Sequence, residues 1–596
     1  MLDYDVVIID SGVNTSPDCE FAGVCVKKIE DEFVFCKSLK DDIGHGTIIN
    51  SIINKRIPQK RIFNIKLSGS IDEVDESFLI AAFSYVDKNL RCKVINVSLG
   101  VKIIEYDKQL YTLCRKIASK GICIVSAFDN DGCFSYPAAF DCVIGVDNSN
   151  MLSHQNEYCY VENSPINILA MGNVQHVRLF DEKTVFVGGS SIACAHISSI
   201  LASAGNSITS FESAQKYLKT NALYTYNSSH AECFHNNEIF NIMTAVVFPF
   251  SKEMQAFLRF SKQLSFNIKG YYDVRQSGKV GRKLSSFFEE ADTEETIKNI
   301  DEVDFTGVDT IILGHLDELN FYSGHDYRSE LINIAIKEKI NVYSFDPLEQ
   351  YSPLFKDRGV KRYYPVVTKN DLPENTFGKL YKISKPVVGI FGTSSHQGKF
   401  SLQLALRNQL ALKGYNVGTI GTEPHAALFG FDVEFPMGYN STVKLEYNEI
   451  VQYLNNEINK ICLEGKEVIL TATQAQIIPF YYNNLLEFPS MQYFFAVGTN
   501  PDAVILCINY FDENLYIKNS IFALIGLTNA SVLALVMYPI TTSSEWGGIS
   551  SSRRKITAEE YNKKAHELEE YLNIPVYMLG DEGDLNKLCE NIIDFF

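Results

Sequence analysis

The sequence is poor in several features that mark particular classes of protein. Only 17 of its 596 residues are proline while 46% are hydrophobic, a composition typical of ordered globular proteins. Its 14 cysteines are scattered without a Cys-x-x-Cys pair, so we expect reduced thiols, many of them buried. The 54 basic residues are outnumbered by 72 acidic ones. The net charge of −18 would repel nucleic acids and anionic membranes, so neither is an expected partner.

A secretory signal is also missing from the N-terminal sequence. MLDYDVVIIDSG has no basic segment and no small-residue cleavage site, and its apolar run reads as a buried strand. We therefore expect a cytoplasmic protein. The longest apolar stretch, residues 521–540, is interrupted by Thr528, Asn529 and Ser531. A core helix followed by a buried parallel strand is expected there, in preference to a membrane span.

Segments typical of strands and helices alternate along the chain. This rhythm predicts an α/β protein in three parts. Residues 1–225 are expected to form a doubly wound, mostly parallel sheet, residues 240–385 a Rossmann-like domain, and residues 386–596 a P-loop NTPase-like domain. The polar stretch 225–238 is the expected linker between the first two parts.

Three short motifs in the first part carry the residue types of one nucleophilic mechanism. Asp10 ends the apolar run VVIID, His45 stands between two glycines in DDIGHGT, and Ser191 opens an apolar helix in GGSSIACAH. A serine hydroxyl is a poor nucleophile until a base takes its proton, and the base needs a buried acceptor that fixes its tautomer. The order Asp, His, Ser along the chain therefore indicates a catalytic triad.

The same region resembles the subtilase family of serine proteases, with its doubly wound parallel sheet. Beyond the triad, the resemblance is carried by VINVSLG (94–100), SAFDNDG (126–132) and SYPAAFDCVIGV (135–146). It implies that the Asn130 side chain and the Ser191 backbone N–H form the oxyanion hole. It also implies that the strand of Ser98, Leu99 and Gly100 lines the substrate groove. We expect proteolysis to require no cofactor, and we assign no metal site from the sequence.

The chain departs from the subtilase pattern at points that affect the shape of the substrate pocket. The helix after His45 reads TIINSIIN instead of a run of small residues, and Phe128 and Asp129 replace the small residues that usually precede Asn130. His196 lies inside the helix that Ser191 opens, and we interpret it as a packed structural histidine.

A glycine-bounded loop, GIFGTSSHQGKFS, opens the third part of the chain. It follows an apolar strand and precedes a helix, the context in which backbone N–H groups and a lysine cradle phosphate. Five residues separate its glycines, and Phe400 precedes Ser401, so the spacing departs from Walker A and resembles dethiobiotin-synthetase-like P-loops. The expected ligand is ATP or another phosphate-bearing molecule, and the alternative is a glycine-rich turn with a surface lysine. The residues expected to bind it are Gly392, Gly398, Lys399 and Ser401.

Residues 240–596 as a whole resemble an uncharacterised two-domain family, some members of which are described as acyltransferases or epimerases of small amino acids. The resemblance rests on the P-loop and on the stretches 421–432, 469–476 and 498–507. Thr471 to Gln474 stand where that family has an acidic Glu-Gly-Gln-Gly stretch, which puts magnesium binding and nucleotide hydrolysis in doubt. Glu423 and His425 are candidate catalytic residues or ordinary loop residues.

Together these patterns predict an intracellular serine endopeptidase that processes a peptide or protein substrate. Leader removal from a ribosomally made, bacteriocin-type peptide is the favoured role, because an attached binding module could restrict the specificity of a cytoplasmic protease. In addition, residues 245–260 resemble clostridial peptide-maturation proteins. The C-terminal module would bind substrate, partner maturation enzymes or a nucleotide, and a homo-oligomer is compatible with the sequence. One alternative is a scaffold with an idle protease domain. The other is a bifunctional protein whose C-terminal half is an ATP- or acyl-CoA-dependent transferase.

Overall fold

The chain forms two compact units in a computed structural model. The structure describes residues 2–14, 21–30, 32–69, 74–104, 108–227, 239–287, 294–356, 358–543 and 552–596. The first unit consists of residues 1–231 together with residues 373–384, and the second of residues 232–372 and 385–596. Most of the expected linker, residues 228–238, lies outside the described residues.

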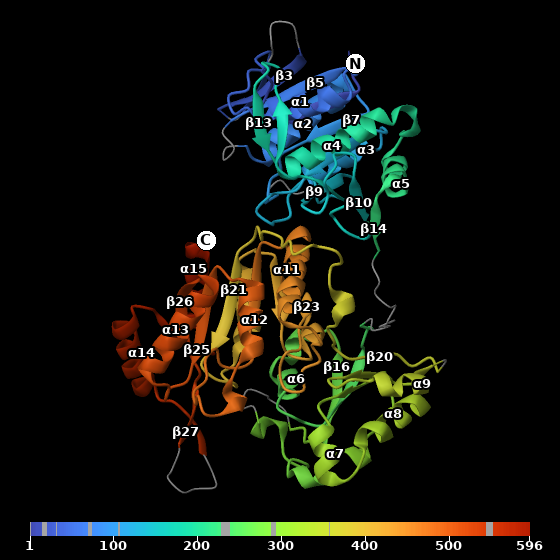
Figure 1. Ribbon diagram of the computed structural model, residues 1–596. Coiled ribbons are helices and arrows are strands. Elements are labelled where there is room, and N and C mark those ends of the chain that lie inside the picture. The colour runs from blue at the N-terminus through green and yellow to red at the C-terminus, as the bar shows by residue number, and fades with distance from the viewer. Residues whose placement is uncertain are drawn as a thin grey trace. The chain divides into compact units, whose positions relative to one another are not determined.

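A ten-stranded sheet is the frame of the first unit (Figure 1). Its strands lie in the order β14-β10-β11-β9-β8-β7-β2-β5-β3-β4, parallel from β11 to β3 and antiparallel where β10 meets β11 and where β4 meets β3. The strands are β2 (Val6–Asp10), β3 (Ala22–Ile29), β4 (Glu32–Cys36), β5 (Ile62–Ser68), β7 (Val94–Val97), β8 (Cys123–Ala127), β9 (Ile144–Ser149), β10 (Tyr158–Val161), β11 (Ile168–Met171) and β14 (Tyr224–Tyr226). Two small ladders pair β1 (Leu2–Asp3) with β6 (Leu90–Arg91) and β12 (Gln175–Arg178) with β13 (Thr184–Val187).

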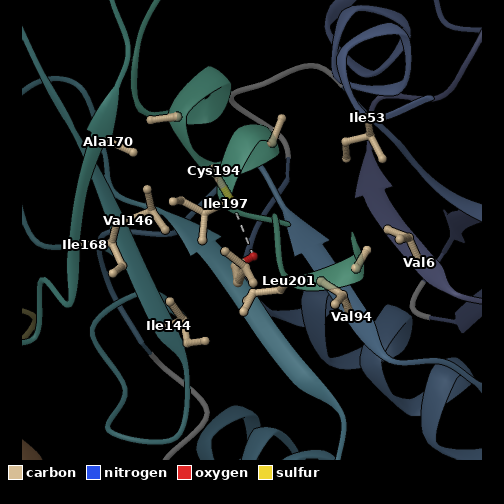
Figure 2. Close-up of a cluster of buried hydrophobic side chains, with 14 of the residues drawn as sticks. Val6, Ile53, Val94, Ile144, Val146, Ile168, Ala170, Cys194, Ile197 and Leu201 are labelled. Atoms are coloured by element: carbon tan, nitrogen blue, oxygen red, sulfur yellow. Dashed lines mark hydrogen bonds between the residues drawn. The ribbon is translucent and has the colours of Figure 1, made fainter. Parts of the chain in front are cut away.

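Helices cover both faces of this sheet, as the doubly wound prediction requires. They are α1 (His45–Arg56), α2 (Glu76–Asn89), α3 (Gln109–Ala118), α4 (Ser190–Ser203) and α5 (Phe211–Asn221). Successive strand residues point to opposite faces, so Val6 and Ile8 of β2 pack in one core cluster and Val7 and Ile9 in another. Figure 2 shows the first cluster, in which Ile53 of α1 lies near Val6 of β2 and Ile197 of α4 lies near Val146 of β9. The fold of residues 1–225 is thus the predicted one.

Two parallel sheets form the second unit. One has the order β17-β16-β15-β18-β19-β20. In chain order this is 3-2-1-4-5-6, the strand order of Rossmann sheets. It contains β15 (Thr244–Phe248), β16 (Asn267–Asp273), β17 (Lys298–Asn299), β18 (Thr310–Leu313), β19 (Asn341–Ser344) and β20 (Arg362–Tyr363), with helices α6 (Gln255–Arg259), α7 (Asp317–Ser323), α8 (Tyr327–Glu338) and α9 (Ser352–Phe355).

The other sheet has the order β23-β22-β24-β21-β25-β26-β29. Its strands are β21 (Val387–Gly392), β22 (Val417–Gly421), β23 (Val433–Glu434), β24 (Val468–Ala472), β25 (Ala503–Ile508), β26 (Ser531–Met537) and β29 (Val576–Met578). A hairpin of β27 (Ile540–Ser543) and β28 (Ser552–Lys555) follows β26. The helices are α10 (Lys399–Leu412), α11 (Tyr447–Leu463), α12 (Ser490–Thr499), α13 (Asn514–Thr528), α14 (Ala558–Leu572) and α15 (Glu582–Phe595).

The division into units differs from the three consecutive domains that the sequence predicts. Each predicted domain has its own sheet, but the second and third share one hydrophobic core. Val247 and Tyr343 from the six-stranded sheet pack in the same cluster as Leu404 and Phe429 from the P-loop part. Because of this shared core, residues 240–385 and 386–596 form one compact unit. The exception is residues 373–384, which belong to the first unit.

The apolar stretch 521–540 forms the end of α13 followed by the parallel strand β26, as the sequence predicts. Among the described residues there is no helix of the length and hydrophobicity needed to cross a bilayer.

The packing of α4 against the sheet generates a test of this fold. Ile197 is fully buried, so Ile197→Ala should leave a cavity and lower the free energy of opening of α1 and α4 by about 2–5 kcal/mol. Native-state hydrogen exchange of amides in those helices measures this quantity. The matched control is Ile200→Ala, because Ile200 lies on the same helix but is only partly buried. An equal effect of the two substitutions would contradict the assigned packing.

Candidate active site

Asp10 and His45 are brought together at the carboxyl edge of the ten-stranded sheet. Asp10 is the last residue of β2 and is almost completely buried, and His45 is the first residue of α1. His45 Nδ1 lies 2.8 Å from Asp10 Oδ1. The carboxylate charge raises the pKa of His45 above its ordinary value, against the opposing effect of burial. This contact leaves Nε2 as the ring nitrogen that can act as a base.

Glycine is required at the positions on either side of His45, for a different physical reason at each. Gly44 caps α1 with φ 90°, a conformation that side chains rarely adopt. A Cβ on Gly46 would lie 2.2 Å from the Gly12 carbonyl oxygen, so only glycine lets α1 approach the end of β2 this closely. The GHG sequence is therefore what allows His45 to reach Asp10.

Asp41 organises the loop that carries His45, a role that the sequence analysis missed. Its Oδ1 accepts from the Gly44 N–H at 2.7 Å and from the Ser11 hydroxyl at 2.8 Å, and its Oδ2 accepts from Thr47 N–H at 2.8 Å. These hydrogen bonds hold the pKa of Asp41 below its ordinary value although burial opposes them. The signal for this role was an acidic residue four positions before His45 with a threonine two positions after it.

Ser191 lies at the N-terminal end of α4, beside the end of β7. Its hydroxyl donates to the Ser98 carbonyl oxygen at 3.0 Å, and the residue is partly exposed. The positive end of the α4 dipole favours negative charge on this oxygen. Asp10, Ser98 and Ser191 thus lie at the same edge of the sheet, with the Ser191 hydroxyl bonded to a backbone oxygen.

Asn130 follows β8 at the same edge and is oriented by the residue that precedes Ser191. Its Oδ1 accepts from the Ser190 N–H at 3.0 Å and from the Ser190 hydroxyl at 3.1 Å. The Ser190 hydroxyl also contacts the Phe128 carbonyl oxygen. With Oδ1 fixed on Ser190, the amide donor Nδ2 is the group left for an external acceptor. This is the orientation that an oxyanion hole needs.

The strand segment expected to line the substrate groove continues directly from β7. Ser98 is buried and its hydroxyl accepts from Asn96 Nδ2 at 2.8 Å, whereas Leu99 is half-buried and Gly100 is exposed. Val101 then pairs with Tyr136 in an antiparallel bridge. Residues 98–100 are therefore anchored at one end and accessible at the other.

His196 has no part in this arrangement. It is 1% exposed, and its ring nitrogens contact Gln175 at 3.2 Å and Arg56 at 3.5 Å. Burial lowers its pKa to about 4, so it is a neutral, packed histidine near pH 7.

The glycine-bounded loop of the second unit has the expected position between β21 and α10. Lys399 opens the helix, is almost fully buried, and donates to the Ser394 carbonyl oxygen at 2.7 Å. Burial lowers its pKa to about 8. The side chain of Gln397 crosses the loop, accepting from the Ser394 N–H at 3.0 Å and donating to Thr393 Oγ1 at 2.6 Å. Gly398 caps the helix with φ 75°, and Gly392 ends β21.

Ser401 is not part of the loop. Its hydroxyl accepts from Arg259 Nη1 at 3.4 Å, while Phe400 packs among the aromatic side chains around Phe429 and Phe431. The acidic residue that a magnesium site would need is also missing at the end of β24, where Thr471, Ala472 and Thr473 stand. The residues at the end of β24 therefore do not fit a nucleotide-bound magnesium ion.

In the second unit, His425 is buried and Glu423 is half-buried. Burial raises the pKa of Glu423 to about 7 and lowers that of His425 to about 3. Glu423 lines a cavity of about 30 Å³ together with Glu253 and His315. His425 is instead surrounded by Phe257, Phe345, Phe400 and Phe429. The cavity beside Glu423 is therefore small, and His425 is not among the residues that line it.

Comparisons with known proteins divide the chain in the same way as the motifs do. Residues 5–240 match the model of the subtilase family, and residues 375–588 match that of a P-loop domain of unknown function, DUF1611. A DUF1611 family protein from Anabaena variabilis is a similar solved structure, with 12% identity and a TM-score of 0.42. That match covers 59% of this chain and 100% of the other.

Two solved proteases are also similar. The prenylagaramide maturation protease PagA has 19% identity and a TM-score of 0.25, over 33% of this chain and 73% of its own. The nisin leader peptidase NisP from Lactococcus lactis has 18% identity and a TM-score of 0.29, over 36% and 81%. No curated protein matches the chain.

The contact between Asp10 and His45 makes the titration of His45 a direct test of the site. Asp10→Asn should lower the pKa of His45, because the attraction of the carboxylate is lost and burial remains. In the unaltered protein the raised pKa stabilises the fold below about pH 6.5, and this contribution is lost as the pH rises through the folded-state pKa. NMR titration of the His45 ring measures this pKa in the unaltered protein and in Asp10→Asn.

Asp42→Asn is the control for this titration, because Asp42 lies in the same loop but is exposed. A His45 pKa that is unchanged in Asp10→Asn, or changed equally in Asp42→Asn, would contradict the assigned contact.

Proposed function

Because residues 5–240 form a subtilase domain, we propose that this protein is a serine endopeptidase with Ser191 as its nucleophile. The observation that carries the proposal is the 2.8 Å contact between Asp10 and His45 at the edge where α4 presents Ser191. A serine hydroxyl is activated by a histidine whose orientation a buried carboxylate fixes, and Asp10 and His45 supply such a pair at the edge of the sheet where α4 begins.

The proposed reaction begins with rotation of the Ser191 hydroxyl from the Ser98 carbonyl oxygen toward His45 Nε2. Oγ then attacks the carbonyl carbon of the scissile peptide bond, His45 takes the Oγ proton, and Asp10 stabilises the imidazolium. His45 gives the same proton to the leaving amine as the C–N bond breaks. Water hydrolyses the resulting acyl-enzyme by the same route, which restores the Ser191 hydroxyl.

The reaction also requires stabilisation of the negative charge that develops on the carbonyl oxygen. The Asn130 Nδ2 group and the Ser191 backbone N–H are the donors that we assign to it, because Ser190 already holds Asn130 Oδ1. Loss of one such donor costs about 10²–10³-fold in kcat. Ser98 to Gly100 would bind the substrate as a neighbouring strand.

We further propose that the substrate is a ribosomally made peptide from which a leader or other segment is removed. Among the similar solved structures, PagA is named as a maturation protease and NisP as a leader peptidase. Residues 245–260 add a short resemblance to peptide-maturation proteins. Cleavage at one position of a precursor peptide encoded beside the gene would support this role. Indiscriminate cleavage of unfolded proteins, with that precursor left intact, would contradict it.

Covalent labelling tests the nucleophile. A fluorophosphonate probe should label the full chain on Ser191, and Ser191→Ala should lose the label and any peptide cleavage. Ser203→Ala is the control, because Ser203 lies at the far end of the same helix and its hydroxyl donates to the Ser199 carbonyl oxygen at 2.7 Å. An unlabelled wild-type protein that cleaves nothing would favour the alternative of a scaffold with an idle protease domain.

A second function, ligand binding by the P-loop part, is favoured by one cavity. The cavity has a volume of about 630 Å³ and lies where β26 and β29 end, beside Ser401 and Leu402 of α10. Its lining includes apolar side chains and the basic residues Arg259 and Arg554. Ligands of open parallel sheets bind at the carboxyl ends of the strands, and the volume is typical of small-molecule sites. We propose that a nucleotide-type ligand, ATP or an acyl-CoA, places its phosphates at Lys399 and its base in this cavity.

Calorimetry with ATP and with coenzyme A tests this second function. Binding should persist in EDTA, because the residues around the loop do not fit magnesium. It should weaken as the pH rises through about 8, where Lys399 loses the proton that holds a phosphate. Lys399→Ala should abolish binding, and Lys413→Ala, at the exposed end of α10, should not. Heat from neither ligand would exclude the nucleotide site and with it the transferase alternative.

A further inference from the structure

Residues 373–384 are separated from the rest of the first unit by about 140 residues of sequence, yet they fold with it. We call residues 373–384 the strap. Hydrogen bonds that involve backbone atoms fix it to the unit at two places. The Phe134 N–H donates to the Leu380 carbonyl oxygen at 3.0 Å. Asn375 Nδ2 donates to the Glu162 carbonyl oxygen at 3.0 Å, and the Asn375 carbonyl oxygen accepts from the Ser164 hydroxyl at 2.9 Å.

Lys379 is the charged centre of the strap. Its side chain is only 7% exposed, and its ammonium group lies 3.1 Å from Asp147 Oδ2 and 3.2 Å from the Asp129 carbonyl oxygen. The same nitrogen is 5.8 Å from the ring centroid of Phe128. Breaking a buried ion pair by removing one partner leaves an uncompensated charge, so such a pair holds its surroundings in a defined arrangement.

Tyr381 extends the strap's contacts along the same loop. Its ring stacks on Phe134 with centroids 4.4 Å apart, and Phe134 meets Phe128 edge to face at 5.8 Å. Cys133 and Leu380 also form a parallel backbone bridge. The strap therefore contacts residues on both sides of Asn130 in the sequence, at Phe128 and Asp129 before it and at Cys133 and Phe134 after it.

The loop of residues 128–134 is held from a second direction by the start of α4. Ser190 donates to the Phe128 carbonyl oxygen and to Asn130 Oδ1. The strap fixes the backbone of the loop, and Ser190 fixes the amide that the loop carries. An oxyanion donor must be held in place before the reaction, because a preorganised donor stabilises the transition state without the free-energy cost of rearrangement.

We propose that the strap holds the loop that carries the oxyanion donor Asn130 and that Lys379 is a positioning residue for Asn130. The inference rests on the proposed protease function. It makes the protease dependent on a segment that the chain supplies only after residues 232–372, so residues 1–231 alone lack part of their active-site support.

The test compares Lys379→Met, Lys379→Arg and Lys382→Met in the full chain. The substrate is a chromogenic peptide anilide selected from a library with the wild-type protein, and rates are divided by the active sites that a fluorophosphonate titrates. Lys379→Met should lower kcat about 10–100-fold with little change in KM, because an oxyanion donor acts in the transition state. Lys379→Arg should recover most of the loss. Lys382 is exposed on the same strap, so Lys382→Met should behave as wild type.

A double-mutant cycle with Asn130→Ala separates positioning from a general loss of stability. In the Asn130→Ala background, Lys379→Met should cause little further loss of kcat, because the donor that it positions is already absent. Losses that multiply would overturn the proposal, as would a wild-type kcat in Lys379→Met. A wild-type protein that is not labelled by the fluorophosphonate and cleaves no peptide would instead contradict the proposed protease function.

Hydrogen exchange distinguishes a local effect of Lys379→Met on the loop of Asn130 from a general loss of stability of the first unit. The amides of residues 128–136 should exchange faster in this variant while those of β2 and α1 stay as in wild type. Faster exchange throughout the first unit would show a merely structural role and overturn the proposal.

Discussion

The ion pair and hydrogen bond between Asp10 and His45 is the interaction on which the remaining arrangement depends. A buried carboxylate is costly unless it is satisfied, and here one oxygen faces the imidazole while the Ser11 N–H donates to the same atom at 2.7 Å. The close approach of α1 to β2, through Gly46, and the hydrogen bonds of Asp41 to the loop both follow from the need to deliver His45 to this position. The chemistry that we propose at Ser191 depends on this contact in turn.

The parallel sheet explains how residues far apart in sequence share this edge. Strands β2, β7 and β8 run side by side in the same direction, so the residues that follow them, or end them, meet at their carboxyl ends. Asp10, Ser98 and Asn130 occupy these three places. The second unit uses the same geometry for its P-loop and for the cavity at the ends of β26 and β29. Two kinds of site thus arise from one property of parallel strands.

Much of the fold and the site could be predicted from the sequence, because apolar strands and glycine-flanked polar residues leave local signals. VVIID predicted β2, and DDIGHGT and GGSSIACAH predicted the starts of α1 and α4. The strap could not be predicted, because Lys379, Asn375 and Tyr381 find their partners across about 200 residues of sequence and carry no local pattern. The shared core of the second unit was missed for the same reason. Ser401 was expected to bind phosphate, whereas its hydroxyl accepts a hydrogen bond from Arg259.

The central claim is that Asp10, His45, Ser191 and Asn130 act on one carbonyl group. A crystal structure of the full chain with a peptide aldehyde tests it most directly. The account predicts a covalent bond from Ser191 Oγ to the aldehyde carbon, with the resulting oxygen about 2.7–3.1 Å from Asn130 Nδ2 and from the Ser191 backbone nitrogen. His45 Nε2 should lie within hydrogen-bond distance of Oγ. An unmodified Ser191, or an adduct whose oxygen points away from Asn130, would contradict the account.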